Sequence, residues 1–339
     1  MFSHDQYQAL QHGAGLLDRR SRGRLQLTGP DRRTYLHGLL TNDITALSAG
    51  TGCYAALLTP QGRMLSDMRV SELGDRILVD LPEATADSVR QRLTDFIFTE
   101  DVEVRDASAE LRHFGVYGPR AAEVLGQSLT ELESAEATEL DSMPLETNRE
   151  FRFGEGTVVI IRSDDYGVAG FETLVSASEA DRWADTLRAR GAVDVDAAAV
   201  EVTRVEAGRP EYGPDMDDHT IPLEAGIEAR AISQTKGCYV GQEVIVRVLH
   251  RGQGRVARHL VGLIPDLEAT PLGRGMRLEA GGKSIGSITS VVFSPRVGRP
   301  IALAYVHRDF AEPGRVIHVA AEAGSAGPSL TVVTTPFVR

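Results

Sequence analysis

The chain has 339 residues, a formal net charge of −12, and 42% hydrophobic and 25% charged residues. This length predicts roughly two or three domains, and the composition is that of a globular protein. The acidic balance argues against general affinity for nucleic acid or an anionic membrane, and no apolar stretch approaches the ~20 residues that span a bilayer. The first residues lack the features of a secretory signal, and there are only two cysteines. We therefore expect a cytoplasmic protein without nucleic-acid or membrane partners.

The first third of the chain predicts an α+β unit. Residues 25–30 alternate apolar and polar side chains before a Gly-Pro turn, which indicates a strand, and Asp31 is placed to cap a helix that runs to about residue 40. Residues 53–58 and 64–70 flank a Thr-Pro-Gln-Gly turn and predict a β-hairpin. A strand at 76–81, a helix at 82–96 and a strand at 101–105 complete the unit.

The same pattern begins again at residue 111. A strand before Gly118-Pro119 is followed by a helix to about residue 129, a hairpin at 151–162, a strand at 171–176 and a helix at 178–190. The acidic segment 129–146 is expected to form a solvated helix or loop. Two copies of one order predict an internally duplicated body, each copy with an antiparallel sheet and helices on one face, similar to the split ferredoxin-like unit.

The composition changes at about residue 258. Short apolar runs separated by glycine and proline predict strands at 260–263, 276–279, 284–292, 301–306, 316–320 and 331–334. Because little helical periodicity is present, this part is expected to be a small β-barrel or sandwich.

An octapeptide contains one of the two cysteines: Lys236-Gly237-Cys238-Tyr239-Val240-Gly241-Gln242-Glu243. Its glycines permit a tight turn, and the lysine ammonium favours the reactive thiolate. Residues 244–248 (Val-Ile-Val-Arg-Val) predict a strand, so the octapeptide is expected to be a loop that leads into it. The alternative is a plain turn in which the cysteine fills a small apolar space. Cys53 lies in a predicted strand and is expected in the core.

Other patterns in the sequence bear on possible binding sites. Arg247, Arg251, Arg255 and Arg258 form either a solvated surface or a site for an anionic group. The acidic run at 215–219 ends in a histidine, but no second histidine stands at helical spacing, so we expect no metal site. Neither a complete phosphate-binding loop at residues 282–284 nor a dinucleotide fingerprint is found.

Together these motifs resemble a known family. Besides the octapeptide, six sequence blocks carry the resemblance. They are residues 29–31, 39–43 (Leu-Leu-Thr-Asn-Asp), 52–54 (Gly-Cys-Tyr), 204–208 (Arg-Val-Glu-Ala-Gly), 212–217 and 221–224 (Ile-Pro-Leu-Glu). From about residue 16 to the last residue, the chain resembles a folate-binding protein of the YgfZ type, related in fold to the aminomethyltransferase (T-protein) of the glycine cleavage system. The octapeptide is the part that is specific to the YgfZ type.

The resemblance implies three lobes around a central hole that holds reduced folate. The implied lobes are residues 1–25 with 112–214, residues 26–111 with 215–257, which carry the Cys238 loop, and the C-terminal barrel at 258–339. The expected fold class is therefore α+β, with a duplicated T-protein-like body and a C-terminal β-barrel.

The resemblance also implies site residues. Asp67 matches the aspartate that contacts the folate nitrogen that accepts the one-carbon unit, although Ser66 stands where the T-protein usually has a second aspartate. The residues that match those that help hold the folate are Tyr54, Tyr166, Glu172 and Arg204. This chain has one residue fewer between Tyr166 and Glu172 than the T-protein has. From chemistry alone, a carboxylate suits the donors of a pterin and an arginine suits the glutamate tail of folate. The alternatives are a solvated carboxylate at Asp67 and structural ion pairs at Glu172 and Arg204.

Two main functions follow, and we favour the first. The first is a tetrahydrofolate-binding accessory protein that supports the assembly or repair of iron–sulfur enzymes. These enzymes would be its partners, and Cys238 would be the functional thiol. One cysteine cannot hold a cluster alone, because clusters need about four thiolates. The alternative is a folate-dependent one-carbon transferase or demethylase that uses Asp67, so catalytic turnover is left open. A scaffold that has lost folate binding is the third possibility.

Overall fold

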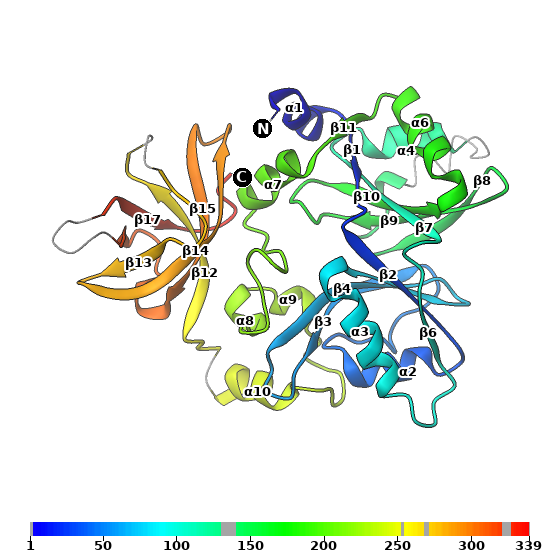
Figure 1. The fold of residues 1–339 in the computed structure, drawn as a ribbon, viewed down its shortest axis with the longest axis horizontal. Helices are drawn as coiled ribbons and strands as arrows, with labels where there is room; N and C mark the ends of the chain where they lie inside the picture. The colour runs from blue at the N-terminus through cyan, green and yellow to red at the C-terminus, as the bar shows by residue number, and fades with distance from the viewer. Residues whose placement is uncertain (1–2, 130–139, 252–253, 268–270, 321–326, 339) are drawn as a thin grey trace. The chain divides into compact units, whose positions relative to one another are not determined.

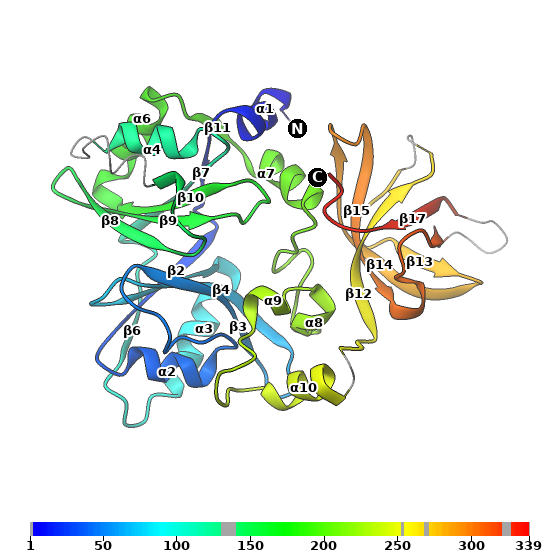
Figure 2. The ribbon, with the colours of Figure 1, turned by 180° about the vertical axis from the view of Figure 1, so that it is seen from behind.

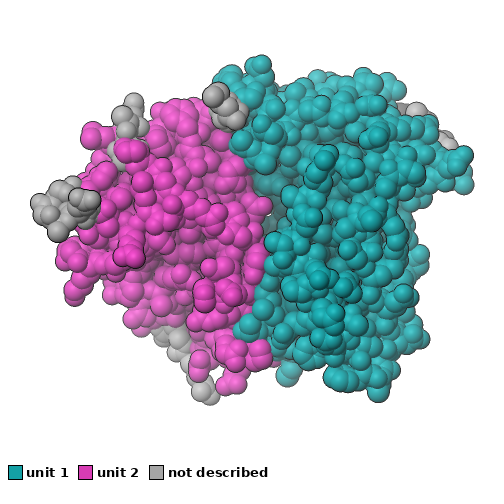
Figure 3. Space-filling view, in the orientation of Figure 1, with its two compact units in different colours: residues 1–59, 65–200, 230–240 teal, residues 60–64, 201–229, 241–339 magenta. Residues whose placement is uncertain are grey.

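The computed structural model describes residues 3–129, 140–251, 254–267, 271–320 and 327–338. The chain divides into two compact units: residues 1–59, 65–200 and 230–240 form the first, and residues 60–64, 201–229 and 241–339 form the second (Figure 3). The three-lobe arrangement expected from the sequence stays a prediction. Most of the acidic segment expected to be a solvated helix or loop, at 130–139, lies outside the described residues. Among the helices that the structure describes, we find none with the length and apolar character needed to cross a bilayer.

The first unit contains a five-stranded sheet with the order β3-β4-β5-β2-β6. Its strands and two helices are β2 (Arg22–Thr28), α2 (Arg32–Leu39), β3 (Thr51–Leu58), β4 (Met64–Glu72), β5 (Ile77–Pro82), α3 (Glu83–Asp95) and β6 (Glu103–Asp106). All of these elements were expected from the sequence. Asp31 does not cap α2 as we expected, because its carboxylate instead accepts a hydrogen bond from the backbone N–H of Asp101 at 2.9 Å.

A six-stranded sheet in the same unit has the order β11-β1-β7-β10-β9-β8. Its elements are β1 (Gly15–Asp18), β7 (Leu111–Tyr117), α4 (Ala121–Ser128), β8 (Asn148–Phe153), β9 (Gly156–Ser163), β10 (Gly170–Ser176), α6 (Ala180–Ala189) and β11 (Val193–Val195), with α1 (His4–His12) before them. The run β8-β9-β10-β7 repeats β3-β4-β5-β2. The second copy differs in that β1 lies between β7 and β11. The predicted duplication is therefore confirmed.

The two sheets pack face to face, and each carries its helices on the outer face (Figures 1 and 2). On β10, Phe171 and Val175 join the core beneath α4 and α6, whereas Leu174 packs in the small cluster with Leu78 of β5. Side chains alternate across a strand, so Glu172 lies on the same inner face as Leu174. Polar groups on the inner faces of both sheets therefore share one buried layer.

The second unit contains a closed barrel with the strand order β12-β15-β14-β13-β16-β17. The strands are β12 (Arg258–Pro265), β13 (Arg277–Ala280), β14 (Lys283–Ser294), β15 (Arg299–His307), β16 (Val316–Val319) and β17 (Ser329–Val333). Each corresponds to a strand expected from the sequence. The α+β class with a C-terminal barrel is confirmed. The helices α7 (Ala197–Glu206), α8 (Pro222–Ala225), α9 (Glu228–Ala231) and α10 (Gln242–Val246) lie between the second sheet and the barrel in sequence.

The strand predicted at 244–248 is wrong. The chain forms the helix α10 there and continues as a π-helical turn at Arg247–Arg251. Gly241 precedes the helix in the left-handed region, with φ of 83°, and Ile245 is fully buried. β-Branched residues favour a strand only when a sheet edge is present to receive it, and this segment has none among the described residues.

Candidate functional site

Tyr54 and Asp67 meet on the inner face of the five-stranded sheet. They lie on the neighbouring strands β3 and β4, and the Tyr54 hydroxyl donates to Asp67 Oδ2 at 2.7 Å. Burial, and next the Asp67 carboxylate, raise the pKa of Tyr54 well above its usual value, so the hydroxyl stays protonated. Ser66 points the other way and bonds Thr85 of α3. The register that we matched therefore places Asp67, not Ser66, in the inner layer.

The second oxygen of Asp67 has no hydrogen-bond partner among the residues that the structure describes. Asp67 is only 7% exposed, and its Oδ1 is buried without a hydrogen bond from any described residue. A buried carboxylate oxygen without a donor carries a desolvation penalty that a ligand's N–H or O–H can remove. A solvated hairpin carboxylate, the alternative that the sequence left open, does not fit this burial.

Two guanidinium groups flank the ring of Tyr54. The guanidinium carbons of Arg69 and Arg230 lie 5.9 and 5.2 Å from its centre. Arg69 also pairs with Glu146 and with Asp165, and Arg230 pairs with Asp164 at 3.2 Å. These pairs fix cations next to the aromatic ring without using the free oxygen of Asp67.

Glu172 lies at the centre of a second group in the same layer. It is 1% exposed, and His113 Nε2 lies 2.7 Å from its Oε2. Arg19 forms an ion pair with Oε1, and the Tyr117 hydroxyl donates to the same oxygen. Burial alone would raise the pKa of Glu172, but Arg19 and His113 outweigh it and hold the pKa below its usual value. Glu172 is therefore a buried carboxylate anion.

Asp165 connects the two groups. Its Oδ2 accepts from Arg69 Nε at 2.9 Å and from Arg19 at 3.3 Å. Tyr166 follows in sequence, and its ring packs edge-on against Tyr117 at 5.1 Å between ring centres, with Arg19 5.4 Å from its own centre. The structure therefore brings four predicted residues, Tyr54, Asp67, Tyr166 and Glu172, into one connected network.

Arg204 belongs to the second unit. From α7 it donates to Glu201 and to Asp215, with N–O distances of 2.6 Å in both cases, and to Ser290 Oγ of β14 at 2.9 Å. Asp215, from the acidic run that we weighed as a metal site, also accepts from Thr289 and Ser290. Within the described residues, no group of three or more acidic, histidine or cysteine side chains is arranged to hold a metal ion.

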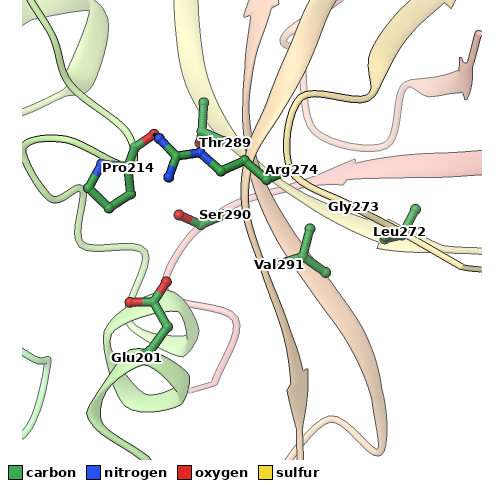
Figure 4. Close-up of a pocket in the computed structure, with 8 residues that line it drawn as sticks. All are labelled: Glu201, Pro214, Leu272, Gly273, Arg274, Thr289, Ser290 and Val291. Atoms are coloured by element: carbon green, nitrogen blue, oxygen red, sulfur yellow. The ribbon is translucent and has the colours of Figure 1, made fainter. Parts of the chain in front are cut away.

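A pocket of about 410 Å³ lies beside this cluster (Figure 4). Its lining includes Glu201, Thr289, Ser290 and Arg274. The guanidinium of Arg274 donates to the carbonyl oxygens of Gly213 and Pro214, at 2.7 and 3.1 Å. Arg204 is buried and surrounded by acceptors of its own chain, so its side chain ties α7 to the barrel strand β14.

Two family models together match almost the whole chain. Residues 2–236 match the GCVT N-terminal domain, and residues 258–339 match the glycine cleavage T-protein C-terminal barrel domain. The chain belongs to the glycine cleavage T-protein family. Tetrahydrofolate, the cofactor expected from the sequence, is the one that this family uses. The T-protein fold implied by the resemblance is confirmed, whereas these matches give no support to the finer YgfZ type.

Relatives and solved structures agree with the T-protein family. An aminomethyltransferase of Rippkaea orientalis is 30% identical over 348 residues, which cover 99% of this chain and 89% of the relative. Another, from Saccharopolyspora erythraea, is 29% identical and covers 98% and 89% of the two chains. The crystal structure of the glycine cleavage system aminomethyltransferase T from Bartonella henselae aligns with a TM-score of 0.86 and 25% identity, over 98% of this chain and 89% of that one.

The cysteine loop of this T-protein family member is attached to its first repeat. Lys236 donates from Nζ to three backbone carbonyls at the end of α2: those of His37, Leu40 and Asn42. Burial lowers the pKa of Lys236 to about 8. The ammonium that we expected to favour a Cys238 thiolate is therefore engaged with backbone oxygens.

Cys238 itself is exposed, whereas Tyr239 is buried with its ring 5.0 Å from Lys236 Nζ. Of the remaining motif residues, Gly237 has no atom other than those of its chain neighbours within 4 Å of where a side chain would begin, and Gly241 has a positive φ of 83°, which favours glycine. Gln242 and Glu243 begin α10 in the second unit. The loop thus presents one thiol outward from a backbone that is fixed at Lys236.

The Leu-Leu-Thr-Asn-Asp block has a positioning role that the sequence did not show. Thr41 Oγ1 donates to the carbonyl of Ala231 at 2.6 Å, and Asn42 Nδ2 donates to the carbonyls of Arg230 and Tyr54 at 3.0 and 2.8 Å. Asn42 therefore links the strand that carries Tyr54 with the segment that carries Arg230, whose guanidinium lies over the Tyr54 ring.

The sequence analysis missed the partners of these residues in the network, among them Arg19, Arg69, His113, Tyr117 and Asp165. A signal was present for some of them, because a lone charged or polar residue at an alternate position of an apolar strand, such as His113 before Phe114, marks a second polar face. Which carboxylate each of them meets depends on how β1, β7 and β10 pair within one sheet and on how the two sheets stack, and the sequence of a single strand shows neither.

Proposed function

We propose that this protein is a tetrahydrofolate-dependent one-carbon transferase of the aminomethyltransferase type. One observation carries the proposal: Asp67 is buried, oriented through Oδ2 by the Tyr54 hydroxyl, and has an Oδ1 without a donor in the described residues. The names of the relatives support this alternative better than the iron–sulfur role that we favoured from the sequence.

Tetrahydrofolate would supply the nitrogen that carries the one-carbon unit. Asp67 Oδ1 is suited to accept a hydrogen bond, or a proton, from an N–H group placed beside it. Tyr54 prevents the carboxylate from rotating, because its hydroxyl remains protonated and donates to the other oxygen. Arg69 and Arg230 keep positive charge near the ring of Tyr54.

Glu172 and Tyr166 remain proposed folate contacts. Glu172 Oε1 accepts from Tyr117 and pairs with Arg19, and Oε2 is engaged with His113. A carboxylate offers about four acceptor positions, so further donors can be accommodated on Oε2. Arg204 is proposed to hold the folate's anionic tail only if Glu201 or Asp215 releases it, which makes it the weakest of the predicted contacts.

The test combines binding with turnover. Tetrahydrofolate is titrated by calorimetry, and formation of one-carbon-substituted folate from an aminomethyl donor is followed by mass spectrometry. In Asp67→Asn we expect turnover to fall about 10²–10⁴-fold, which is the usual contribution of a positioned acid or base, with folate affinity within tenfold of wild type. Asp75→Asn, at an exposed turn of the same repeat, is the matched control and should leave both unchanged. Equal turnover in Asp67→Asn and wild type would remove Asp67 from the mechanism.

The exposed thiol of Cys238 supports a second candidate function. The Cys238 side chain is exposed on a loop whose neighbour Lys236 is fixed by three carbonyls, which suits a thiol that contacts another protein. We propose the YgfZ-type role, support of iron–sulfur enzymes with these enzymes as transient partners, as this second candidate. Folate binding without turnover, together with failure of Cys238→Ser to restore iron–sulfur enzyme activity in deficient cells, would favour it over the transferase. Full complementation by Cys238→Ser would exclude it.

A further inference from the structure

A separate pocket of about 530 Å³ lies in the first unit, at an edge of the five-stranded sheet. It is formed by the beginning of β2, the first turns of α3, and the segment that follows β6. Its lining includes four arginines: Arg20, Arg22, Arg24 and Arg112. Neither Asp67 nor Glu172 belongs to the lining, so the pocket is distinct from the proposed folate contacts.

Arg24 differs from the other three arginines. Arg22 pairs with Asp80 at 2.9 Å, and Arg20 and Arg112 both pair with Asp18, at 2.6 and 2.9 Å. Arg24 is only 5% exposed and forms no ion pair within the described part of the chain. Its Nη atoms donate to the carbonyls of Arg22 and Ser108, and its Nε is buried without an acceptor. A guanidinium buried without a counter-ion is unfavourable, and an anion in the pocket would remove that penalty.

The N-terminus of α3 provides a second source of positive potential. This helix has 13 residues, begins after Pro82, and has no side-chain cap at its first turn. Gly23 of β2 allows the helix to approach closely, because a Cβ there would lie 2.5 Å from the Cβ of Ala86. The partial positive charge of a helix N-terminus favours anions within its first turn. The N-terminus of α3 and the buried guanidinium of Arg24 therefore both contribute positive potential to the same pocket.

The carboxylates near Arg24 form no ion pair with it among the described residues, and Asp80, Asp106 and Glu83 attract its charge only from a longer distance. Glu83, Asp87 and Asp106 line the pocket but are exposed. Asp87 pairs with Arg90 at 2.7 Å, and Asp106 accepts the backbone N–H of Ser108 at 2.8 Å. An exposed carboxylate can remain in solvent when a ligand enters, whereas Arg24 is held in place by two carbonyls.

We propose that this pocket binds the oxyanion group, phosphate or carboxylate, of a small metabolite, with Arg24 as its buried counter-charge. Guanidinium groups recognise both oxyanions through paired N–H donors. The half-buried Arg112 provides a further cation at the pocket, and the volume leaves room for a ligand larger than the oxyanion itself.

The experiment titrates inorganic phosphate and, separately, succinate into the full chain by calorimetry at low ionic strength. Saturable binding of either probe to the wild-type protein is expected, at least tenfold weaker in Arg24→Gln and unchanged in Arg182→Gln, an exposed arginine of α6. Binding of phosphate alone assigns a phosphate ligand, and binding of succinate alone assigns a carboxylate ligand. Absence of binding by both probes at millimolar concentration overturns the proposal, as does equal binding by Arg24→Gln and wild type.

Circular dichroism first establishes that Arg24→Gln folds. If it does not, Arg112→Gln takes its place, because this residue is partly exposed and its partner Asp18 keeps a second arginine. Threefold or greater weakening in Arg112→Gln supports the site, and unchanged binding overturns it. Both outcomes are independent of folate binding at Asp67.

Discussion

The two repeats of the first unit share a strand order but use their inner faces differently. Asp80 on β5 and Glu172 on β10 occupy equivalent strands, each pairs with an arginine from the N-terminal segment, and both contact His113. In the second repeat every oxygen of the central carboxylate is engaged. In the first repeat a further carboxylate, Asp67, keeps one oxygen without a partner from the described part of the chain. The second repeat therefore holds its central carboxylate in a fixed electrostatic network, and under the proposed function the first repeat would supply the reactive group.

The equivalent helices α2 and α4 also end differently. The last turn of α4 is closed locally, because Ser128 Oγ donates to the carbonyl of Val124 at 2.7 Å. The end of α2 is instead closed by Lys236, nearly two hundred residues further along the chain. The first repeat therefore depends on a distant segment, and that segment is the one that carries Cys238.

The largest expected effect comes from breaking the support in the second repeat. Arg19→Met leaves the buried Glu172 without its arginine, while the half-buried Asp165 keeps Arg69, and we expect a loss of about 3–5 kcal/mol in the free energy of unfolding, which is typical when one partner of a buried ion pair is removed. Urea denaturation measures it. Arg22→Met, which removes the partner of Asp80 at a partly exposed position, should cost less. A larger loss in Arg22→Met than in Arg19→Met would reverse the comparison.

The next largest loss of stability is expected from variants at the C-terminal ends of α2 and α4. Lys236→Met removes the donor to three carbonyls at the end of α2, and unsatisfied buried polar groups cost about 1–3 kcal/mol. Ser128→Ala removes one local bond in α4 and should cost about 1 kcal/mol. Urea denaturation compares the two variants. Equal losses would show that the loop contributes no more to α2 than a serine contributes to α4.

Much of this fold could be predicted from the sequence, because its strands, helices and turns follow from local patterns of apolar, polar and turn-forming residues. Alternation and turn residues located the hairpin that carries Tyr54 and Asp67, the repeat itself, and all six barrel strands. The failure at residues 244–248 has a physical cause: β-branched residues indicate a strand only if a sheet edge receives them.

The candidate site was predicted only in part. The resemblance identified Asp67 and Glu172, but it did not identify the hydrogen-bond and ion-pair partners that distinguish the two carboxylates. Arg19 and His113 reach Glu172 because β1, β7 and β10 are neighbours in one sheet, whereas His113 reaches Asp80 of β5 only because the two sheets stack. These contacts join residues that are 33 to 153 positions apart, and no spacing within a strand encodes them.

Acid titration sharpens the same comparison. Arginine and histidine outweigh burial and hold the pKa values of both Asp80 and Glu172 below those of the unfolded chain, which are about 4. Each carboxylate then stabilises the fold fully above pH ~4, and this contribution is lost as the pH falls toward the folded-state pKa, with a slope of about 1.4 kcal/mol per pH unit per group. Urea denaturation from pH 5 to 2.5 should show a shallower slope in Glu172→Gln and in Asp80→Asn. An unchanged slope in either variant would show that its carboxylate already binds a proton in the folded state at pH 4.

The smallest expected effect separates the two cysteines of the first unit. Cys53 of β3 packs against the core beneath α2, and burial raises the pKa of its thiol to about 12, whereas Cys238 is exposed. Only a thiolate reacts with iodoacetamide, so at pH 8 the folded protein should be alkylated at Cys238 and protected at Cys53, as mass spectrometry can locate. Cys238→Ser should change the free energy of unfolding by less than about 0.5 kcal/mol, because an exposed side chain buries nothing. If that variant also keeps full one-carbon turnover, the thiol has no part in the chemistry at Asp67. A loss of turnover without a loss of stability would instead mean that the cysteine loop, fixed at the end of α2 by Lys236, acts on the first repeat's reactive face.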